Sequence, residues 1–338
     1  MGQCCILEEL SRREDPAIEP ADDYSVTTPE ELAPGVFFLR GGTRYFQEGA
    51  KTGPAGAVRS LMCNNGWVDL GDEVLLVDSN MPSRGDALLA AVRETVGDKP
   101  LRFVVNTHHH GDHVYGNRRI REKTGAAIIG CDAMVEELRR SETGAFGGEP
   151  GRWEQVARLR PDLRDTSLLP PTMTFERALS IEGRDRRVEL HHFGWGHTRG
   201  DTIIWLPGER IVFVGDLVTN GPFNIVRDGE MAEWPDYLAF VESLAPEIVC
   251  PGHGRRGGVD IVTGQRAFFL ALWREVAARA GPGVPLEQIL RQVPDIRAAL
   301  LADPGAAPHV IPEDADLAVL SLPAQVERVF GQIGRARR

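Results

Sequence analysis

The chain has 338 residues, with 38 basic and 49 acidic side chains that give a formal net charge of −11. A negative protein gains no long-range attraction to phosphate backbones, so we expect no nucleic-acid partner. No apolar run reaches the roughly 18 residues that a membrane helix needs, so no membrane partner is expected either.

Residues 1–33 are acidic, contain prolines and lack a period, which is typical of a loose N-terminal arm. The segment Met1–Glu9 has neither a basic start nor a long apolar stretch, so a secretory signal is not expected. The five cysteines are odd in number and lack C-x-x-C spacing, which favours reduced thiols. We therefore expect a cytoplasmic protein.

Short apolar runs bounded by Gly, Asn and Asp begin at residue 36 and predict strands. The first three runs are Val36–Leu39, Val58–Cys63 and Val74–Asp78, and Asn65-Gly66 between the last two indicates a hairpin. The patterns that follow predict, in chain order, a helix over 87–96, a strand over Leu101–Asn106, a helix over Gly116–Lys123, a strand over Ala127–Gly130 and a helix from Asp132 to about Arg140.

Residues 141–175 are rich in Gly, Pro and Arg, and a stretch of this length in a compact chain is usually functional or mobile. We interpret it as a partly helical insertion beside the site. The patterns after it predict strands over Val188–Phe193, Thr202–Leu206 and Ile211–Val214, a helix over Pro235–Leu244 and a strand over Glu247–Cys250. Beyond residue 253 apolar stripes predict helices. This order suits two stacked sheets with helices outside.

The clearest chemical signal is the sequence THHHGDH over Thr107–His113, directly after a predicted buried strand. A loop at the end of such a strand is a rigid place to build a site. His108 and His110 are two residues apart, so an extended turn can aim both rings the same way. Asp112 and His113 can face a second ion. Imidazoles with a carboxylate suit zinc, and iron or manganese less well.

Three later residues of ligand type also lie in tight loops after apolar strands. His197 lies in GWGHTRGD, Asp216 in FVGD and His253 in CPGHG. Each alone is most simply an ordinary loop residue. Together with the histidine run they predict a metal site assembled from several strand ends.

The motifs HxHxDH, GHTxGD, GD and PGHG, in this order from about Val36 to Gly258, resemble those of the metallo-β-lactamase superfamily. The resemblance implies an α+β fold, a four-layer αββα sandwich with metals at one edge of the sheets, followed here by a helical C-terminal extension. We expect three parts: the arm over 1–33, the catalytic domain over 34–260 with the insertion 141–175, and the extension over 261–338.

The resemblance also implies the ligands and the chemistry. His108, His110 and His197 would hold the first metal, Asp112, His113 and His253 the second, and Asp216 would bridge the two. The implied enzyme is a hydrolase that uses a hydroxide bridging two zinc ions to cleave an ester, thioester, lactone or amide bond of a small molecule. Asp112 would be the catalytic residue that orients the hydroxide. Two Zn²⁺ per chain are expected, with iron or manganese as the alternative.

Further residues are expected around these ligands. A metal-bound histidine usually donates the N–H of its other ring nitrogen to a carboxylate or carbonyl. The candidates for such partners here are Asp78, Thr107, Thr198 and Asp201. Loop capping is the competing interpretation. Candidates for substrate contact are Trp195, Arg199, Phe223 and Asn224, against local packing as the simpler interpretation. His109 is expected to point away from the metals, and at most one of His191 and His192 to face them.

Asp216 bears on the branch of the family, because the secreted β-lactamases carry Cys or Ser there. It favours the glyoxalase II, lactonase and related ester or thioester hydrolases. A mononuclear iron thiol or persulfide dioxygenase on the same fold stays open. The diiron flavoproteins have Glu where His110 stands, and the acidic charge disfavours a nuclease. The sequence gives no oligomeric state.

Overall fold

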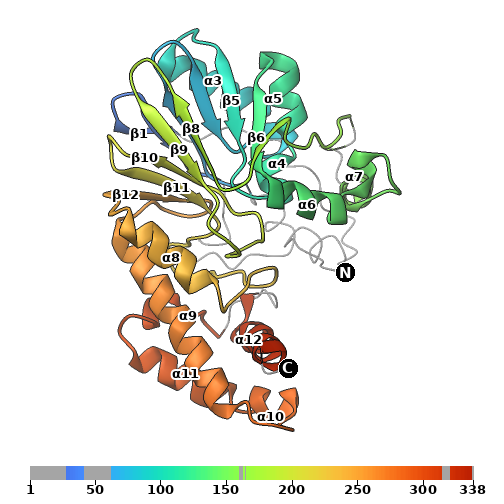
Figure 1. Ribbon diagram of the computed structural model, residues 1–338, viewed down its shortest axis with the longest axis vertical. Helices are drawn as coiled ribbons and strands as arrows, with labels where there is room; N and C mark the ends of the chain where they lie inside the picture. The colour runs from blue at the N-terminus through green and yellow to red at the C-terminus, as the bar shows by residue number, and fades with distance from the viewer. Residues whose placement is uncertain (1–27, 42–61, 160–162, 164, 314–319, 337–338) are drawn as a thin grey trace.

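The computed structural model describes residues 28–41, 62–159, 163, 165–313 and 320–336 (Figure 1). Within these residues the strands form two sheets, one of seven and one of five strands. The first has the order β1 (Glu30–Ala33), β2 (Val36–Leu39), β3 (Asn65–Asp69), β4 (Val74–Val77), β5 (Leu101–Val105), β6 (Ala127–Cys131) and β7 (Met173–Phe175). The second has the order β12 (Ile248–Pro251), β11 (Ile211–Gly215), β10 (Ile203–Leu206), β9 (Arg187–His191) and β8 (Ala178–Glu182).

Strand direction in the first sheet changes at β4. The strands β1 to β4 pair antiparallel, whereas β4 to β7 pair parallel. Parallel neighbours need long crossovers, and helices supply them. These helices are α3 (Gly85–Val96), α4 (Gly111–Val114), α5 (Asn117–Thr124), α6 (Asp132–Ser141) and α7 (Arg152–Leu159). In the second sheet only β11 and β12, among the described strands, pair parallel.

Alternation of side chains along the strands produces the layers. In β2, Phe38 belongs to the apolar cluster that also contains Ile204 of the second sheet, so it lies between the sheets. Its neighbour Phe37 packs instead in a cluster with Leu88 of α3. In β10, Trp205 packs with α8 (Trp234–Ser243) and α9 (Val259–Arg279) on the opposite outer face. The predicted αββα sandwich is confirmed (Figure 1).

The C-terminal extension is helical, as predicted. After α9 it contains α10 (Leu286–Leu290), α11 (Val293–Ala302), a short 3₁₀ turn (Ala307–His309) and α12 (Leu322–Ala336). Figure 1 shows these helices gathered at one end of the molecule, below the second sheet. Their buried side chains share one apolar cluster with β10, β11 and α8, so the extension packs directly on the sandwich. None of the helices within the described ranges is long and apolar enough to cross a membrane.

The hairpin prediction was wrong. Asn65-Gly66 does not form a hairpin turn but begins β3, which pairs with both β2 and β4. The glycine is required by packing: a Cβ at Gly66 would lie 2.1 Å from Cε1 of Phe213 in the facing sheet. Of the strand predicted over Val58–Cys63, residues 58–61 lie outside the described residues and the rest is not in a strand.

Besides β3, three short strands at sheet edges were missed. β1 lies within the predicted arm, of which residues 1–27 lie outside the described residues, and it pairs with β2. β7 ends the predicted insertion 141–175, which also contains α7, and β8 follows at once. These strands lie at the edges of their sheets. Few of their residues are buried, so their sequences lack the alternation of apolar and polar residues that predicts a strand.

Candidate metal centre

The candidate ligands follow the ends of strands that meet at one edge of the sandwich. The loop after β5 and the short helix α4 carry His108, His110, Asp112 and His113. The second sheet contributes the other three from the segments after β9, β11 and β12, namely His197, Asp216 and His253. β9, β11 and β12 run in the same direction, so their carboxyl ends reach the same edge.

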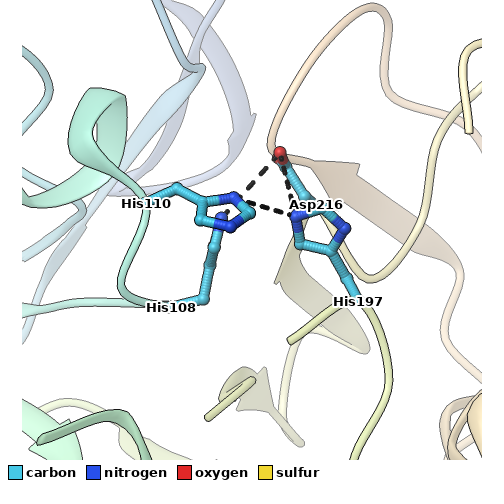
Figure 2. A group of neighbouring side chains, drawn as sticks. All are labelled: His108, His110, His197 and Asp216. Carbon is cyan, nitrogen blue, oxygen red and sulfur yellow. Dashed lines mark hydrogen bonds and ion pairs between the residues drawn. The ribbon is translucent and has the colours of Figure 1, made fainter. Parts of the chain in front are cut away.

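The first group contains His108, His110, His197 and Asp216, with one ligand atom of each within 4.8 Å of the others. Figure 2 shows His108 and His110 approaching from one side and His197 and Asp216 from the other. Nδ1 of His110 lies 3.1 Å from Nε2 of His197. Oδ2 of Asp216 lies 3.9 Å from Nε2 of His108 and 3.7 Å from Nε2 of His197.

The second group contains Asp112, His113 and His253. Nε2 of His253 lies 3.0 Å from Oδ2 of Asp112. Asp216 also reaches this group, because its Oδ1 lies 3.4 Å from Nε2 of His113 and its Oδ2 lies 3.5 Å from Nε2 of His253. Asp216 is therefore in contact distance of both groups.

The donor atoms fit divalent cations. Nε2 of His108, Nε2 of His113 and Oδ1 of Asp216 are buried and have no hydrogen-bond partner. Buried polar atoms are seldom left unpaired, because the loss of solvation is costly. Atoms of this kind that converge from imidazoles and carboxylates are the ligands that zinc takes in proteins. The unpaired atoms and the donor chemistry agree on a cation site.

Burial decides the protonation of His108 and His110 in the first group. It lowers the pKa of His108 well below the usual histidine range. Burial also lowers the pKa of His110 to about 4, although a hydrogen bond with Asp228 acts in the opposite direction. Both rings are therefore neutral at pH 7, and each has a lone pair to offer a cation.

In the second group the charged neighbours of His253 and Asp112 prevail over burial. Burial lowers the pKa of His253, but Asp216 and Asp112 outweigh it and raise the value to about 9. Burial likewise raises the pKa of Asp112, but His113 and His253 hold it at about 2. Without a cation, His253 thus carries a proton that a metal would have to displace.

Two of the predicted supporting residues contact the candidate ligands. Asp78 lies directly after β4, and its Oδ2 is 2.7 Å from Nδ1 of His113. Asp78 also accepts hydrogen bonds from the backbone N–H and the hydroxyl of Thr107, both at 2.8 Å. The Thr107 hydroxyl lies 3.1 Å from Nδ1 of His108. Asp78 and Thr107 therefore orient rings from both groups.

Thr198 and Asp201 have a different role from the one predicted. Asp201 accepts hydrogen bonds from the backbone N–H of Thr198 at 2.9 Å and from its hydroxyl at 2.7 Å. This closes the turn after His197, as the competing capping interpretation has it. Nδ1 of His197 instead lies 3.0 Å from the carbonyl oxygen of Ile225.

Sequence reasoning missed Asp228. Its Oδ2 lies 3.2 Å from Nε2 of His110, and this leaves Nδ1 of that ring facing the first group. The residue is 118 positions further along the chain and belongs to no motif. An aspartate in a loop carries no signal of such a contact by itself.

The predicted substrate residues lie in the segments that follow β9 and β11 of the second sheet. Trp195 donates its indole N–H to the carbonyl of Asp228 at 2.8 Å. Arg199 lies over the Trp195 ring, 5.8 Å from its centroid, with a side chain that is 42% exposed. Phe223 packs against the C-terminal apolar cluster. Asn224 is fully buried and donates to the carbonyl of His309 at 3.4 Å, so it is not placed to contact a substrate.

The remaining histidines lie outside both groups. His109 is buried, with its ring centroid 4.8 Å from that of His110. His191 contacts Glu189 through Nε2 at 3.1 Å, and Nδ1 of His192 lies 2.8 Å from the carbonyl of Asp201. In the part of the chain that the structure describes, none of these three belongs to a group that could hold a metal.

Comparison with protein families gives a match to the model described as "Metallo-beta-lactamase superfamily" over residues 58–253. The type 2 metallo-beta-lactamase of Bacteroides fragilis is 28% identical over 210 residues, which cover 60% of this chain and 73% of that protein. The hydroxyacylglutathione hydrolase of Pelagibacter ubique is 57% identical over 144 residues, which cover 43% of this chain and 47% of that protein. The chain thus spans about half of the length of that relative.

Solved structures agree with this at the level of the fold. The metallo-beta-lactamase from Pontibacter korlensis superposes with a TM-score of 0.55 at 16% identity, covering 73% of this chain and 99% of that one. The DIM-1 metallo-beta-lactamase gives 0.53 at 16% identity, with 73% and 97% covered. Identities this low show a shared fold, and function has to be argued from the site.

Proposed function

Because the chain belongs to the metallo-beta-lactamase superfamily, we propose that it is a hydrolase with two zinc ions that cleaves an ester, thioester, lactone or amide bond of a small molecule. The observation that carries the proposal is the position of Asp216, within 4 Å of histidines of both groups. One carboxylate between two sets of donors is the arrangement expected of a paired metal site.

The residues have separate roles in this proposal. His108, His110 and His197 would hold the first ion, Asp112, His113 and His253 the second, and Asp216 both. When bound, a pair of zinc ions supplies Lewis acidity and brings the pKa of a water close to neutrality.

Asp112 is the proposed catalytic residue. Its pKa of about 2 leaves it ionised at pH 7, so it can only accept hydrogen bonds. A carboxylate in that state orients the attacking water by accepting a hydrogen bond from its O–H. Asp112 is also held in place by Nε2 of His253 at 3.0 Å.

Among the possible bonds, a thioester or ester has the best support. Asp216 stands where the secreted β-lactamases of the superfamily carry Cys or Ser, so an amide of the β-lactam type has less support. Hydroxyacylglutathione hydrolases, whose named substrate is a thioester, recur among the relatives, those of Rhodobacter capsulatus and Rhodospirillum rubrum included. Each of these matches covers about half of the relative, 48% and 55%. We therefore infer from these relatives the class of bond, a thioester or ester, and no particular acyl group.

The test is a hydrolysis screen of the zinc-loaded protein with acylglutathione thioesters, simple lactones and nitrocefin. We expect turnover of thioesters or lactones above nitrocefin. Asp112→Ala should lower kcat by 100-fold or more, about the loss that follows removal of a general base. His191→Gln is the matched control, since His191 lies on β9 outside both groups, and it should keep full activity. Turnover that survives Asp112→Ala would contradict the assignment of Asp112.

A further inference from the structure

The segment that joins β11 to α8, residues 217–233, carries two of the contacts that orient the first group. Its Asp228 carboxylate lies 3.2 Å from Nε2 of His110, and its Ile225 carbonyl lies 3.0 Å from Nδ1 of His197. We call it the flanking segment. Its backbone also meets the loop of His197 directly, because Glu230 donates its N–H to the Gly196 carbonyl at 3.0 Å.

The C-terminal helix α12 holds this flanking segment at Gly229, the residue next to Asp228. Gln332 donates to the Gly229 carbonyl at 2.9 Å and accepts from the backbone N–H of Met231 at 2.8 Å. Arg328, one turn earlier on α12, donates to the same carbonyl through Nε at 3.0 Å and Nη2 at 2.7 Å. Three N–H donors thus converge on one backbone oxygen.

Gly229 is tightly packed against its neighbours. A Cβ there would lie 2.7 Å from Cζ3 of Trp234 and 2.9 Å from the Gly196 carbonyl oxygen. Gln332 is only 2% exposed, so loss of its amide would leave the Met231 N–H short of a partner in a buried place. Movement of Gly229 would therefore carry Asp228 with it.

Other residues of the extension hold the same segment. Gln265 of α9 accepts from the Thr219 N–H at 2.7 Å and donates to the Leu217 carbonyl at 3.3 Å. Gln325 of α12 donates to the Asn224 carbonyl at 3.3 Å. Buried glutamine side chains thus hydrogen-bond to backbone groups of the flanking segment. These bonds add to the apolar packing that joins the helices to the sandwich.

We propose that α12 is a positioning element of the metal centre: Gln332 and Arg328 fix the Gly229 carbonyl, and through it Asp228 orients the His110 ring. This rests on the proposed function only in that the first group binds a cation. The extension then contributes to the site without supplying a ligand.

The test uses the full-length protein freed of metal. Gln332→Met keeps the volume of the side chain but removes both of its hydrogen bonds. Zn²⁺ affinity is measured by competition with a chromogenic chelator, the environment of bound Co²⁺ by its visible absorption spectrum, and fold stability by thermal unfolding. Leu300→Ala, at a buried position of α11, is the control for a weakened extension that leaves the flanking segment's hydrogen bonds in place.

We expect Gln332→Met to lower the affinity of the first group for Zn²⁺ by about 10-fold and to alter the Co²⁺ spectrum. A 10-fold loss is the lower end of the range for removal of a group that supports a metal ligand. Gln332→Glu, which keeps the acceptor for Met231, should recover part of the affinity. Leu300→Ala should lower the unfolding temperature and leave affinity and spectrum unchanged. Arg328→Met, if it folds, should act in the same direction as Gln332→Met.

The link through Asp228 gives a second criterion. Asp228→Asn should weaken the first Zn²⁺ too, and Gln332→Met should then cost much less in that background than in the wild type. Unchanged affinity and spectrum in Gln332→Met, or full additivity with Asp228→Asn, would overturn the positioning role. Wild-type protein that binds no Zn²⁺ would instead overturn the proposed function, and with it the premise of this inference.

Discussion

His113 donates its Nδ1–H to Asp78, 2.7 Å away, and the same ring directs Nε2 at Oδ1 of Asp216, 3.4 Å away. The direction of the first bond follows from chemistry, because an ionised carboxylate can only accept. The ring's other nitrogen is thereby left as the ligand atom. Asp78 also holds Thr107, so one buried carboxylate sets the loop and the ring together.

Asp78→Ala should therefore lower the affinity of the second group for its cation by 10- to 100-fold, the usual effect of removing a partner of a ligand histidine. The first cation should be affected less, since His108 contacts Asp78 only through Thr107. Zn²⁺ titration of the metal-free protein measures both. Glu142→Gln is the control, a buried carboxylate that binds the Tyr115 hydroxyl at 2.9 Å outside both groups. Equal loss at both sites would contradict the assignment.

Binding of the second cation should release protons at neutral pH. The pKa of His253 is raised to about 9, so its ring is charged at pH 7 and must lose a proton to become a ligand. The part of the release that comes from His253 should fall as the pH passes 9, where that ring is already neutral. Calorimetric titration with Zn²⁺ in two buffers of different ionisation enthalpy measures it. Equal heats in the two buffers at pH 7 would contradict this prediction.

Asp216 and His253 should differ in how many metals their loss removes. Among the described residues, His253 pairs with Asp112 and Asp216, whereas Asp216 pairs with histidines of both groups. We expect His253→Ala to keep about one zinc per chain and Asp216→Ala to keep less than one. Elemental analysis after gel filtration gives the ratio. Two zincs retained in Asp216→Ala would remove its bridging role.

Gly66→Ala tests the contact between the sheets. A Cβ at this position would lie 2.1 Å from the Phe213 ring, so the sheets must shift or the ring must turn. Overpacking of this kind costs about 1–3 kcal/mol in the free energy of unfolding. Gly208→Ala, with nothing within 4 Å of the new Cβ, should change it by less than about 0.5 kcal/mol. Denaturant unfolding compares the two variants.

The parts of the site that the sequence predicts are those carried by contiguous motifs at strand ends. His108, His110 and Asp216 are of this kind, because the strand before each sets where its side chain can lie. Asp228 and Gln332 could not be predicted, since each acts across a large separation in the chain through an ordinary loop or helix position. Tertiary packing decides such contacts, and single residues do not encode them.

The fold follows the same division. Long apolar periods predicted α3, α6, α8 and the buried strands, because burial of a whole face is written into their sequences. Asn65-Gly66 misled because a glycine needed for close packing looks the same as one needed for a turn. The edge strands β1, β7 and β8 bury too little to show a pattern.

The most direct test of the central proposal is the metal content of the purified wild-type protein, measured by elemental analysis. We predict about two zinc ions per chain, because Asp216 joins two sets of donors. About one iron per chain, with no second metal taken up on incubation with Zn²⁺, would contradict it and favour a mononuclear iron oxygenase.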